Sequence, residues 1–380
     1  MQLLNLEKQK TIHKIQQLSE FLNKGESPLD YEKQLLKDHS KRISEIFRGK
    51  LIPPYELEIQ PSSLCNLKCK HCFGKALSSN NLKNKITKKE LNILAKKINE
   101  FKEENFSIEV VKFCGTTGEP LVNPSTMYGI TLFKSLGKKI ILFTNGLFLD
   151  RKLDGREYID YILEADKINL SIDAGCEKTF KELKGKTGFK RIIKNIRKLV
   201  YKRNSLDKKL KIIISFVIGE INHKDILRIT QISKDIGVDE LIFRVDFTNP
   251  QRISELSEKI IKDVKEAKKF ENPSFKVISV YSEENIRGDN SGFNSYGRKC
   301  FNCYFWACIG PDCNLYACGH RTYSGVKSYG NLLNKSFKQI WKSKLRKRNI
   351  TCLPDDNCKF CSPSSTRRND FMTFLYNSLN

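Results

Sequence analysis

The sequence predicts an α/β protein in which parallel strands form a partial (β/α)6 barrel, followed by a small cysteine-rich C-terminal domain. Three observations support this prediction. Short β-branched runs alternate with charged stretches of helical period between about residues 55 and 250, and eight of the thirteen cysteines fall after residue 299. The chain has 380 residues, of which 39% are hydrophobic, enough for a barrel core and a smaller module.

Six runs are predicted as strands because each is rich in β-branched or aromatic residues. They are YELEIQP (55–61), IEVVKFCG (108–115), KKIILFTNG (138–146), KINLSIDAG (167–175), KIIISFVIG (211–219) and ELIFRVDF (240–247). The stretches between them include ITKKELNILAKKINEFKEE (86–104) and FKRIIKNIRKLVYKR (189–203), and both show helical spacing of apolar residues. In the second, one apolar face consists of Ile192, Ile193, Ile196, Leu199 and Val200.

The chain is predicted to have five parts. They are a helical N-terminal extension (1–50), a core barrel (51–250), a connecting segment (251–295), a cysteine-rich domain (296–365) and a C-terminal tail (366–380). The extension is predicted to contain two helices that are broken near NKGESPLD (23–30).

Composition predicts a cytoplasmic protein. The first residues are charged, and no apolar run approaches the roughly 18 residues that a membrane span needs. In a reducing compartment, thirteen cysteines indicate metal binding rather than a disulfide framework. The net charge of +25 is spread along nearly every predicted helix, which indicates compositional bias and a basic surface suited to an anionic substrate. The absence of an aromatic-studded RNA-binding signature argues against nucleic acid as the main partner.

Functional residues are expected at the carboxyl ends of the strands, because barrels of this kind place their chemistry in the loops there. The first such loop contains CNLKCKHCFG, which puts Cys65, Cys69 and Cys72 within eight residues. Zinc in a structural site takes four ligands, and catalytic zinc usually takes a histidine among three. Three thiolates without a fourth ligand suit a four-iron cluster with one open iron better. His71 is a less favoured candidate ligand inside the same loop.

With this loop after the first strand and a glycine-rich acidic turn after the second, the chain resembles the radical S-adenosylmethionine (radical SAM) superfamily. The resemblance covers about residues 55–250 and extends into the C-terminal region. It implies a TIM-like partial barrel in which Cys65, Cys69 and Cys72 hold a catalytic [4Fe–4S] cluster. It also implies that S-adenosylmethionine binds the open iron and is cleaved to a 5′-deoxyadenosyl radical, which takes a hydrogen atom from the substrate.

The same resemblance implies the cofactor contacts. In the turn GTTGEP (115–120), Thr117 stands in place of the first glycine of the family's motif, while Gly118 and Glu119 are expected to meet the methionine part of the cofactor. Further contacts are expected from residues at the ends of later strands, namely Asn145, Ser171, Ser215 and Arg244.

The C-terminal cysteines lie in KCFNCYFWACIGPDCNLYACGHR (299–321) and TCLPDDNCKFC (351–361). So short a segment builds little core, so this composition predicts a module held together by metal. IGPDCNLYAC (309–318) predicts a β-hairpin whose turn is at residues 311–314. Cysteines of the hairpin region and the distant pair Cys358 and Cys361 supply four ligands for a closed cluster.

This region resembles the SPASM/Twitch extension of the same superfamily, including the trailing YGNLLNKSFKQIWKS (329–343). The match is better to the shorter Twitch form, which implies one auxiliary [4Fe–4S] cluster. Its implied ligands come from Cys300, Cys303, Cys318, Cys358 and Cys361. The roles of Cys300, Cys308, Cys313 and Cys352 stay open: Cys300 is a candidate either to replace or to join Cys303, and Cys313 stands where the family has a hairpin-turn glycine.

The predicted function is that of a radical SAM enzyme that dehydrogenates a small polar, anionic metabolite, such as a sugar or nucleotide derivative, with help from the auxiliary cluster. The expected partners are that substrate and an electron donor such as flavodoxin or ferredoxin, without a membrane. Arg244, His320 and Arg321 are candidate substrate contacts. A peptide maturase is one alternative, although residues 1–50 look too short for a leader-binding domain. A non-enzymatic binding protein with zinc at both cysteine sites is the other.

Overall fold

The computed structural model describes residues 30–72, 74, 85–116, 118–246, 249–280, 283–287, 299–322, 326–358, 361 and 363–379. All six predicted strands are present, as β1 (Glu56–Ile59), β4 (Val110–Phe113), β5 (Lys139–Thr144), β8 (Lys167–Ser171), β9 (Lys211–Ile218) and β10 (Glu240–Val245). They pair in this order and run parallel, which confirms the predicted α/β fold with a parallel, barrel-like sheet.

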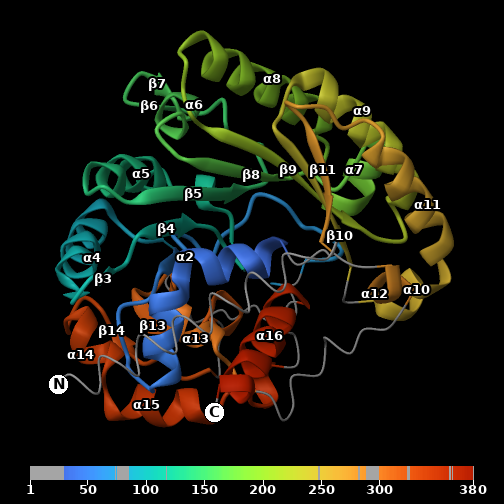
Figure 1. Cartoon of the computed structure of the whole chain (residues 1–380). Coiled ribbons are helices and arrows are strands. Elements are labelled where there is room, and N and C mark those ends of the chain that lie inside the picture. Colours follow the sequence, from blue (N-terminus) through green and yellow to red (C-terminus); the bar gives the residue numbers. More distant parts are fainter. Residues whose placement is uncertain are drawn as a thin grey trace.

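Helices follow the strands and form an arc around the outer face of the curved sheet (Figure 1). Their bounds are α4 (Lys88–Glu100), α5 (Ser125–Ser135), α6 (Tyr158–Ile162), α7 (Glu177–Lys184), α8 (Phe189–Ser205), α9 (Ile226–Ile236), α10 (Pro250–Glu255), α11 (Ser257–Lys268) and α12 (Glu283–Arg287). Burial alternates along β1, β5 and β10; in β10, Leu241, Phe243 and Val245 are buried while Arg244 between them is partly exposed. The partly exposed residues of these three strands therefore face the inside of the curve.

Two predicted helices differ slightly from the structure. The helix expected over residues 86–104 begins at a capping box formed by Thr87 and Glu90, but it ends at Glu100. The chain then turns into a short hairpin of β2 (Lys102–Glu103) and β3 (Phe106–Ser107). In α8 the predicted face is buried except for Ile193, which is only partly buried. A second small hairpin consists of β6 (Lys152–Leu153) and β7 (Arg156–Glu157).

Within the part of the chain that the structure describes, the sheet has ten strands, because it continues past the predicted six at both edges. β11 (Lys276–Ser279) pairs parallel with β10, and β12 (Trp306–Ile309) pairs parallel with β1. β12 and β13 (Asn314–Tyr316) form the hairpin that the sequence predicts, and β14 (Gly330–Asn331) completes the edge. The C-terminal strands are therefore hydrogen-bonded into the same sheet as the barrel, which the sequence did not predict.

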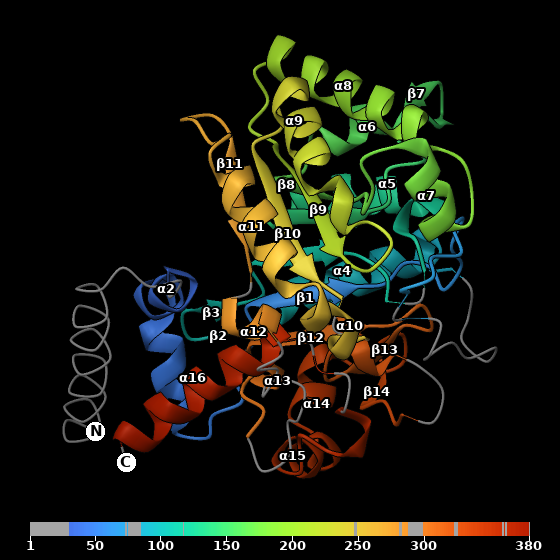
Figure 2. The same ribbon diagram turned by 90° about the vertical axis from the view of Figure 1, so that its right-hand side faces the viewer.

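The two ends of the described chain lie side by side. α2 (Asp30–Phe47) contacts α16 (Pro363–Leu379), and both views show the two helices next to each other (Figures 1 and 2). The other C-terminal helices are α13 (Asn302–Phe305), α14 (Phe337–Trp341) and α15 (Lys344–Thr351). The first helix expected in the N-terminal extension falls in residues 1–29, which lie outside the described residues. The boundaries between the five predicted parts of the chain stay a prediction.

Among the described residues, the structure contains no helix with the length and apolar character that crossing a membrane requires. The cytoplasmic location stays a prediction.

Candidate active site

The three-cysteine loop after β1 rests on the carboxyl end of α7. The backbone nitrogens of Lys68 and Lys70 donate to the carbonyl oxygens of Lys184 (3.1 Å) and Leu183 (2.8 Å). These carbonyls belong to the last turn of α7, where a helix leaves carbonyl groups without intrahelical partners. The loop therefore satisfies the end of α7 and is positioned by it.

None of the thirteen cysteines forms a disulfide, so Cys65, Cys69 and Cys72 are present as thiols. Burial, together with the charges of Glu119 and the other two thiols, raises the pKa of the Cys65 thiol to about 11. Burial also raises the pKa of Cys69. Charge on the neighbouring sulfurs thus opposes the ionisation of Cys65 and Cys69, and a bound cationic group would stabilise their thiolates.

This donor set fits an iron–sulfur cluster. Among the described residues, no three His, Cys, Asp or Glu side chains converge on one point as the ligands of a single metal ion do. A four-iron cluster does not need such convergence, because each thiolate binds a different iron. Cys65, Cys69 and Cys72 would hold three irons of such a cluster.

A buried ion pair lies beneath the loop. Lys184 Nζ donates to Asp173 Oδ2, and both side chains are only 3% exposed. Asp173 Oδ1 accepts a hydrogen bond of 2.7 Å from the backbone nitrogen of Val217, and His71 Nε2 lies 3.2 Å from Asp173 Oδ2. Burial acts to raise the pKa of Asp173, but Lys184 and His71 outweigh it and hold the pKa well below its ordinary value. His71 thus has a carboxylate partner in the structure.

The ammonium of Lys184 also acts on the thiols. Burial lowers the pKa of Lys184, but the charges of Asp173, Cys69 and Cys72 raise it above its ordinary value. Sequence reasoning missed both Lys184 and Asp173. The available signal for Asp173 was its place in SIDAG at the end of a strand, where the structure puts it in a left-handed conformation (φ +53°).

The turn after β4 needs glycine at two positions because the backbone approaches closely. A Cβ atom on Gly118 would lie 2.0 Å from the carbonyl oxygen of Ser62, and one on Gly115 would lie 2.3 Å from the carbonyl oxygen of Gly118. The turn therefore packs its bare backbone against the start of the three-cysteine loop. Thr117 lies outside the described residues.

Glu119 joins this turn to the next strand. Its carboxylate accepts hydrogen bonds from Thr144 Oγ1 (2.5 Å) and from the backbone nitrogens of Asn145 (2.9 Å) and Leu121 (3.0 Å). Burial raises the pKa of Glu119, while these hydrogen bonds act in the opposite direction. Both carboxylate oxygens are thus engaged by the protein, so the structure gives Glu119 a positioning role, and its predicted contact with the cofactor stays a prediction.

Asn145 ties the same region to the cysteine loop. Its Nδ2 donates to Asn66 Oδ1 at 2.7 Å, and its Oδ1 accepts from the backbone nitrogen of Leu147 at 3.0 Å. Asn66 lies directly after Cys65, so this hydrogen bond fixes the loop next to a predicted ligand.

The remaining predicted contacts form a second group on neighbouring strands. Ser171 and Ser215 are register partners on β8 and β9. Arg244 Nη1 on β10 donates to Ser215 Oγ at 2.7 Å. Asp173, two residues after Ser171, connects this group to the cysteine loop through His71. The predicted site residues that the structure describes thus come together around one end of the sheet.

The five predicted C-terminal ligands are also brought together, from segments far apart in sequence. They are Cys300, Cys303, Cys318, Cys358 and Cys361, here called the C-terminal cysteine group. Burial raises the pKa of Cys318, and Cys300, Cys361 and Cys358 raise it further. Burial, Cys300 and Cys358 likewise raise the pKa of Cys361 to about 11. Cys303 Sγ donates to the carbonyl oxygen of Cys300 at 2.9 Å.

The other three C-terminal cysteines have different surroundings. Cys308 lies on β12 with its sulfur 3.7 Å from Glu58 Oε1. Cys313 is buried in the hairpin turn with φ +63°, the conformation that explains a glycine at this place in relatives. Cys352 is exposed at the end of α15.

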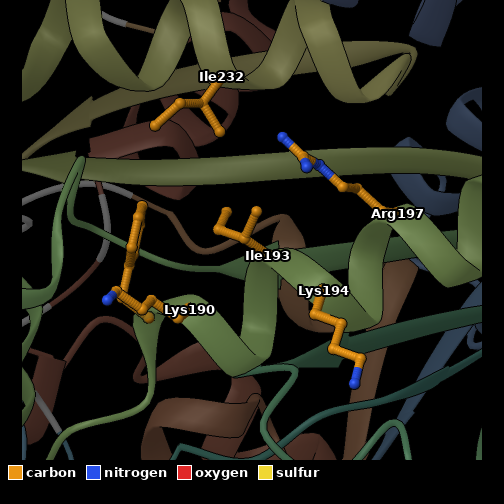
Figure 3. A pocket seen from close by; sticks show the side chains of 6 residues that line it. Lys190, Ile193, Lys194, Arg197 and Ile232 are labelled. Atoms are coloured by element: carbon orange, nitrogen blue, oxygen red, sulfur yellow. The ribbon is translucent and has the colours of Figure 1, made fainter.

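A hollow of roughly 330 Å³ lies outside the barrel, between α8 and α9. Its lining combines the apolar side chains of Phe189, Ile193 and Ile232 with Lys190, Lys194 and Arg197. Ile193 and Ile232 lie between the two helices, and the labelled basic side chains come from α8 (Figure 3). None of the predicted site residues lines this hollow.

The profile of the Radical SAM superfamily matches residues 59–231, from the end of β1 into α9. The chain contains a radical SAM domain. The matched range includes Cys65, Cys69, Cys72 and the predicted contacts up to Ser215, while Arg244 lies beyond it. Radical SAM domains use a [4Fe–4S] cluster and S-adenosylmethionine, so the predicted enzyme class and these cofactors are confirmed at the level of the superfamily.

Several similar sequences carry the name probable GTP 3′,8-cyclase. One from Saccharolobus islandicus (strain L.S.2.15 / Lassen #1) is 27% identical over 190 residues, which are 50% of this chain and 56% of the relative. One from Metallosphaera sedula is 25% identical over 221 residues, 55% of this chain and 64% of the relative. The chain thus spans somewhat more than half the length of the curated relatives that it matches.

Solved structures share the fold beyond the radical SAM domain. Streptococcus suis SuiB, at 17% identity and a TM-score of 0.58, covers 86% of this chain and 74% of its own. The protein anSMEcpe with bound AdoMet, at 17% identity and a TM-score of 0.55, covers 83% of this chain and 88% of its own. The shared fold therefore extends over most of the chain, while the SPASM/Twitch assignment of the C-terminal region stays a prediction.

Proposed function

We propose that the chain cleaves S-adenosylmethionine reductively and uses the resulting radical to dehydrogenate a small anionic metabolite, with a nucleotide or sugar derivative as the substrate class. The observation that carries this proposal is the presence of two separate groups of cysteines that form no disulfides. Cys65, Cys69 and Cys72 are held at the carboxyl ends of the strands, and the C-terminal cysteine group lies in a region whose strand β12 pairs with β1.

When bound, the cluster of the first group and S-adenosylmethionine supply one electron and a 5′-deoxyadenosyl radical, which removes a hydrogen atom from the substrate. The chain's own residues position the reactants. The close packing at Gly115 and Gly118 places the turn against the start of the cysteine loop, while Glu119 and Asn145 hold the turn and the loop together. Ser215 and Arg244 present a hydroxyl and a cation at the strands opposite.

The second thiol group is the reason for proposing that the substrate is oxidised. In the proposed dehydrogenation, the substrate first loses a hydrogen atom to the 5′-deoxyadenosyl radical. It then loses one proton to a base and one electron to the oxidised C-terminal site, which forms a double bond in the product. One electron enters and one leaves, so each turnover converts S-adenosylmethionine to methionine and 5′-deoxyadenosine without net consumption of electrons. A flavodoxin- or ferredoxin-like protein would supply the first electron.

The substrate class rests on charge and on the relatives. The net charge of +25 favours an anionic substrate, and Arg244 projects from the inner face of β10. The similar archaeal sequences carry the name GTP 3′,8-cyclase, which is consistent with a nucleotide.

A peptide maturase is the second candidate function. SuiB has also been crystallised with its precursor peptide SuiA, and that structure matches with a TM-score of 0.58 at 18% identity over 87% of this chain and 76% of its own. In this case the substrate would be a peptide and the same two thiol groups would serve.

Anaerobic incubation with S-adenosylmethionine and dithionite tests these candidates. Nucleotides, sugar phosphates and peptides are supplied in separate reactions, and 5′-deoxyadenosine and product masses are measured. The proposal expects 5′-deoxyadenosine together with a nucleotide or sugar product two mass units lighter. A modified peptide would establish the second candidate, and a small-molecule product with a new carbon–carbon bond or with no net oxidation would contradict the dehydrogenase.

The alanine triple variant of Cys65, Cys69 and Cys72 is the matched control. It is expected to lose about four irons and all cleavage of S-adenosylmethionine, while iron at the C-terminal cysteine group remains. Iron and sulfide analysis of the anaerobic protein separates this proposal from the zinc-binding alternative, which predicts zinc at both sites.

A further inference from the structure

Arg321 connects the C-terminal cysteine group to a carboxylate. Its Nη1 and Nη2 donate to Asp355 Oδ1 (2.6 Å) and Oδ2 (2.9 Å), and Nη1 also lies 3.4 Å from Cys358 Sγ as a donor. The Arg321 side chain is 12% exposed. A guanidinium in a two-point pair with a carboxylate has a fixed orientation. One of its N–H groups is therefore held towards the Cys358 sulfur.

A second cation lies behind the same group. Arg346 is fully buried, and its Nη2 donates to the carbonyl oxygen of Cys303 at 2.6 Å. The guanidinium stacks over the ring of Trp341, with Cζ 3.3 Å from the ring centroid. On another side, Asn369 Nδ2 donates to Cys300 Sγ at 3.8 Å. Donor groups thus approach the C-terminal cysteine group from three segments of the chain.

The three-cysteine loop near β1 differs in how its buried cation is used. The ammonium of Lys184 is bonded to Asp173, so its closest contact is a carboxylate. Arg321, in contrast, directs one N–H at a cysteine sulfur while a separate pair of N–H···O bonds holds it.

The sign of the effect that these contacts have on the reduction potential of a bound cluster follows from charge. A reduced cluster carries one more negative charge than the oxidised cluster, and hydrogen bonds to its sulfurs stabilise the more negative form. A cation that donates to a ligand sulfur therefore raises the reduction potential. A carboxylate near the same sulfur lowers it.

We infer that Arg321 raises the reduction potential of a cluster held by the C-terminal cysteine group, so that this site accepts the electron of the substrate radical. This inference rests on the proposed function and makes Arg321 a positioning and tuning residue rather than the substrate contact that the sequence predicted. In the accepting step, the deprotonated substrate radical loses one electron, the cluster gains it, and the proton has already gone to a base.

The test measures potential in the full chain with the Cys65, Cys69 and Cys72 triple substitution as background, so that only the C-terminal site holds iron. Two variants are titrated with an electron paramagnetic resonance readout, namely Arg321→Met and Arg321→Lys. Arg252→Met is the control, because Arg252 pairs with Glu220 and Glu255 at a partly exposed position.

We expect Arg321→Met to lower the ratio of reduced to oxidised cluster about tenfold at fixed applied potential, a shift of about 59 mV for a one-electron couple. Arg321→Lys keeps the charge but loses the two-point pair with Asp355, so it should lower the potential by less. The control should leave the potential unchanged.

Different results contradict different claims. Iron-free protein in the triple-substitution background overturns the auxiliary site and, with it, this inference. Iron-loaded variants whose potential equals that of the background overturn the role of Arg321 and leave the proposed function standing. If Arg321→Met does not retain iron, the iron-loaded Arg321→Lys variant decides, and an unchanged or higher potential in that variant overturns the inference.

Discussion

At the scale of single residues, the cysteine loop is held by contacts that are not themselves ligands. Gly118 lets the turn after β4 touch the backbone at Ser62, Asn145 bonds to Asn66, and Lys184 lies beneath Cys69 paired with Asp173. Each of these contacts comes from a different strand end or helix end. The position of the three thiols therefore depends on the whole rim.

Gly118→Ala should displace the cysteine loop. The new Cβ would lie 2.0 Å from the Ser62 carbonyl oxygen, so the backbone must move. Since a misplacement of about 1 Å near a reacting centre can cost roughly a hundredfold in rate, we expect about that loss in S-adenosylmethionine cleavage, with reduced iron content. Gly219→Ala is the control, because its Cβ would meet nothing closer than 3.7 Å. Equal activity of both variants would show that the close approach has no bearing on the site.

Lys184→Met should destabilise the fold more than the double variant Lys184→Met/Asp173→Asn. The single change leaves the buried Asp173 carboxylate without its ammonium partner, which costs about 3–5 kcal/mol in unfolding free energy. Asparagine tolerates the left-handed conformation of residue 173 and removes the charge. Denaturant unfolding of the apo-protein measures the difference. If the double variant is no more stable than the single one, the charge of Asp173 is not the cause.

At the scale of elements, β1 is the strand on which both thiol regions meet. Glu58 on β1 has register partners on both sides, Lys112 on β4 and Cys308 on β12. Lys112 Nζ lies 2.8 Å from Glu58 Oε2, and Gln60 Nε2 donates to Glu58 Oε1 at 2.8 Å. A carboxylate thus joins three neighbouring strands on the inner face of the sheet.

Glu58 should make stability fall in acid. Burial acts to raise its pKa, but Lys112, Cys114 and Gln60 outweigh burial and lower the pKa to about 2. A depressed carboxyl pKa stabilises the fold above its ordinary value near 4.5, and this contribution is lost as the pH falls from 4.5 towards 2. The expected loss is about 3 kcal/mol. In Glu58→Gln, the free energy of unfolding measured with denaturant should change little between pH 4.5 and 2. The exposed Glu266→Gln, as the control, should keep the wild-type dependence on pH. If the free energy of unfolding of Glu58→Gln falls in parallel with that of the wild type, Glu58 does not have this role.

The sequence predicted the six core strands because each is a compact β-branched run followed by a helical period. It did not predict β11 or the pairing of β12 with β1. The sequence places residues 306–309 only in a cysteine-rich segment, and the partner of β12 lies some 250 positions earlier in the chain. Helix α4 ends at Glu100 rather than at residue 104, because Phe101 leaves the helical path and stacks on Phe337 at 5.3 Å. Long-range partners of this kind leave no local pattern.

For the site, local motifs identified the three-cysteine loop, the glycine turn and the strand-end polar residues. Local motifs could not identify Lys184, because a lysine at the end of an amphipathic helix is expected to be exposed to solvent. Its burial depends on how the loop after β1 docks on α7. The same holds for Arg321 and Arg346, whose contacts with Cys358 and Cys303 arise only when distant segments come together.

At the scale of the whole molecule, the C-terminal region closes one edge of the barrel sheet. β12 covers β1, and Trp341 Nε1 donates to the carbonyl oxygen of Ile52 at 2.9 Å just before that strand. Helices from both ends of the described chain pack together beside it (Figure 2). The predicted domain division is therefore crossed by backbone hydrogen bonds.

Removal of residues 299–380 should produce an aggregating protein rather than a free barrel. The deletion uncovers the hydrogen-bonding edge of β1 (Glu56–Ile59), and unpaired edge strands associate with one another. Size-exclusion chromatography with light scattering compares the deletion variant with the full-length chain, which serves as the control. A monodisperse truncated protein that still binds iron at the Cys65 loop would contradict this prediction.

The pairing of β1 with β12 also means that β1 is synthesised long before its partner strand. Glu58 and Cys308 are separated by 250 positions in the chain, and at about 5–20 residues per second a ribosome needs about 12–50 s to make that interval. During this time β1 and the loop with Cys65, Cys69 and Cys72 have left the ribosome, but the strand that covers β1 does not yet exist. The nascent chain therefore offers an open strand edge to chaperones, and its first thiol group is accessible to iron–sulfur assembly factors, before the last strands complete the sheet.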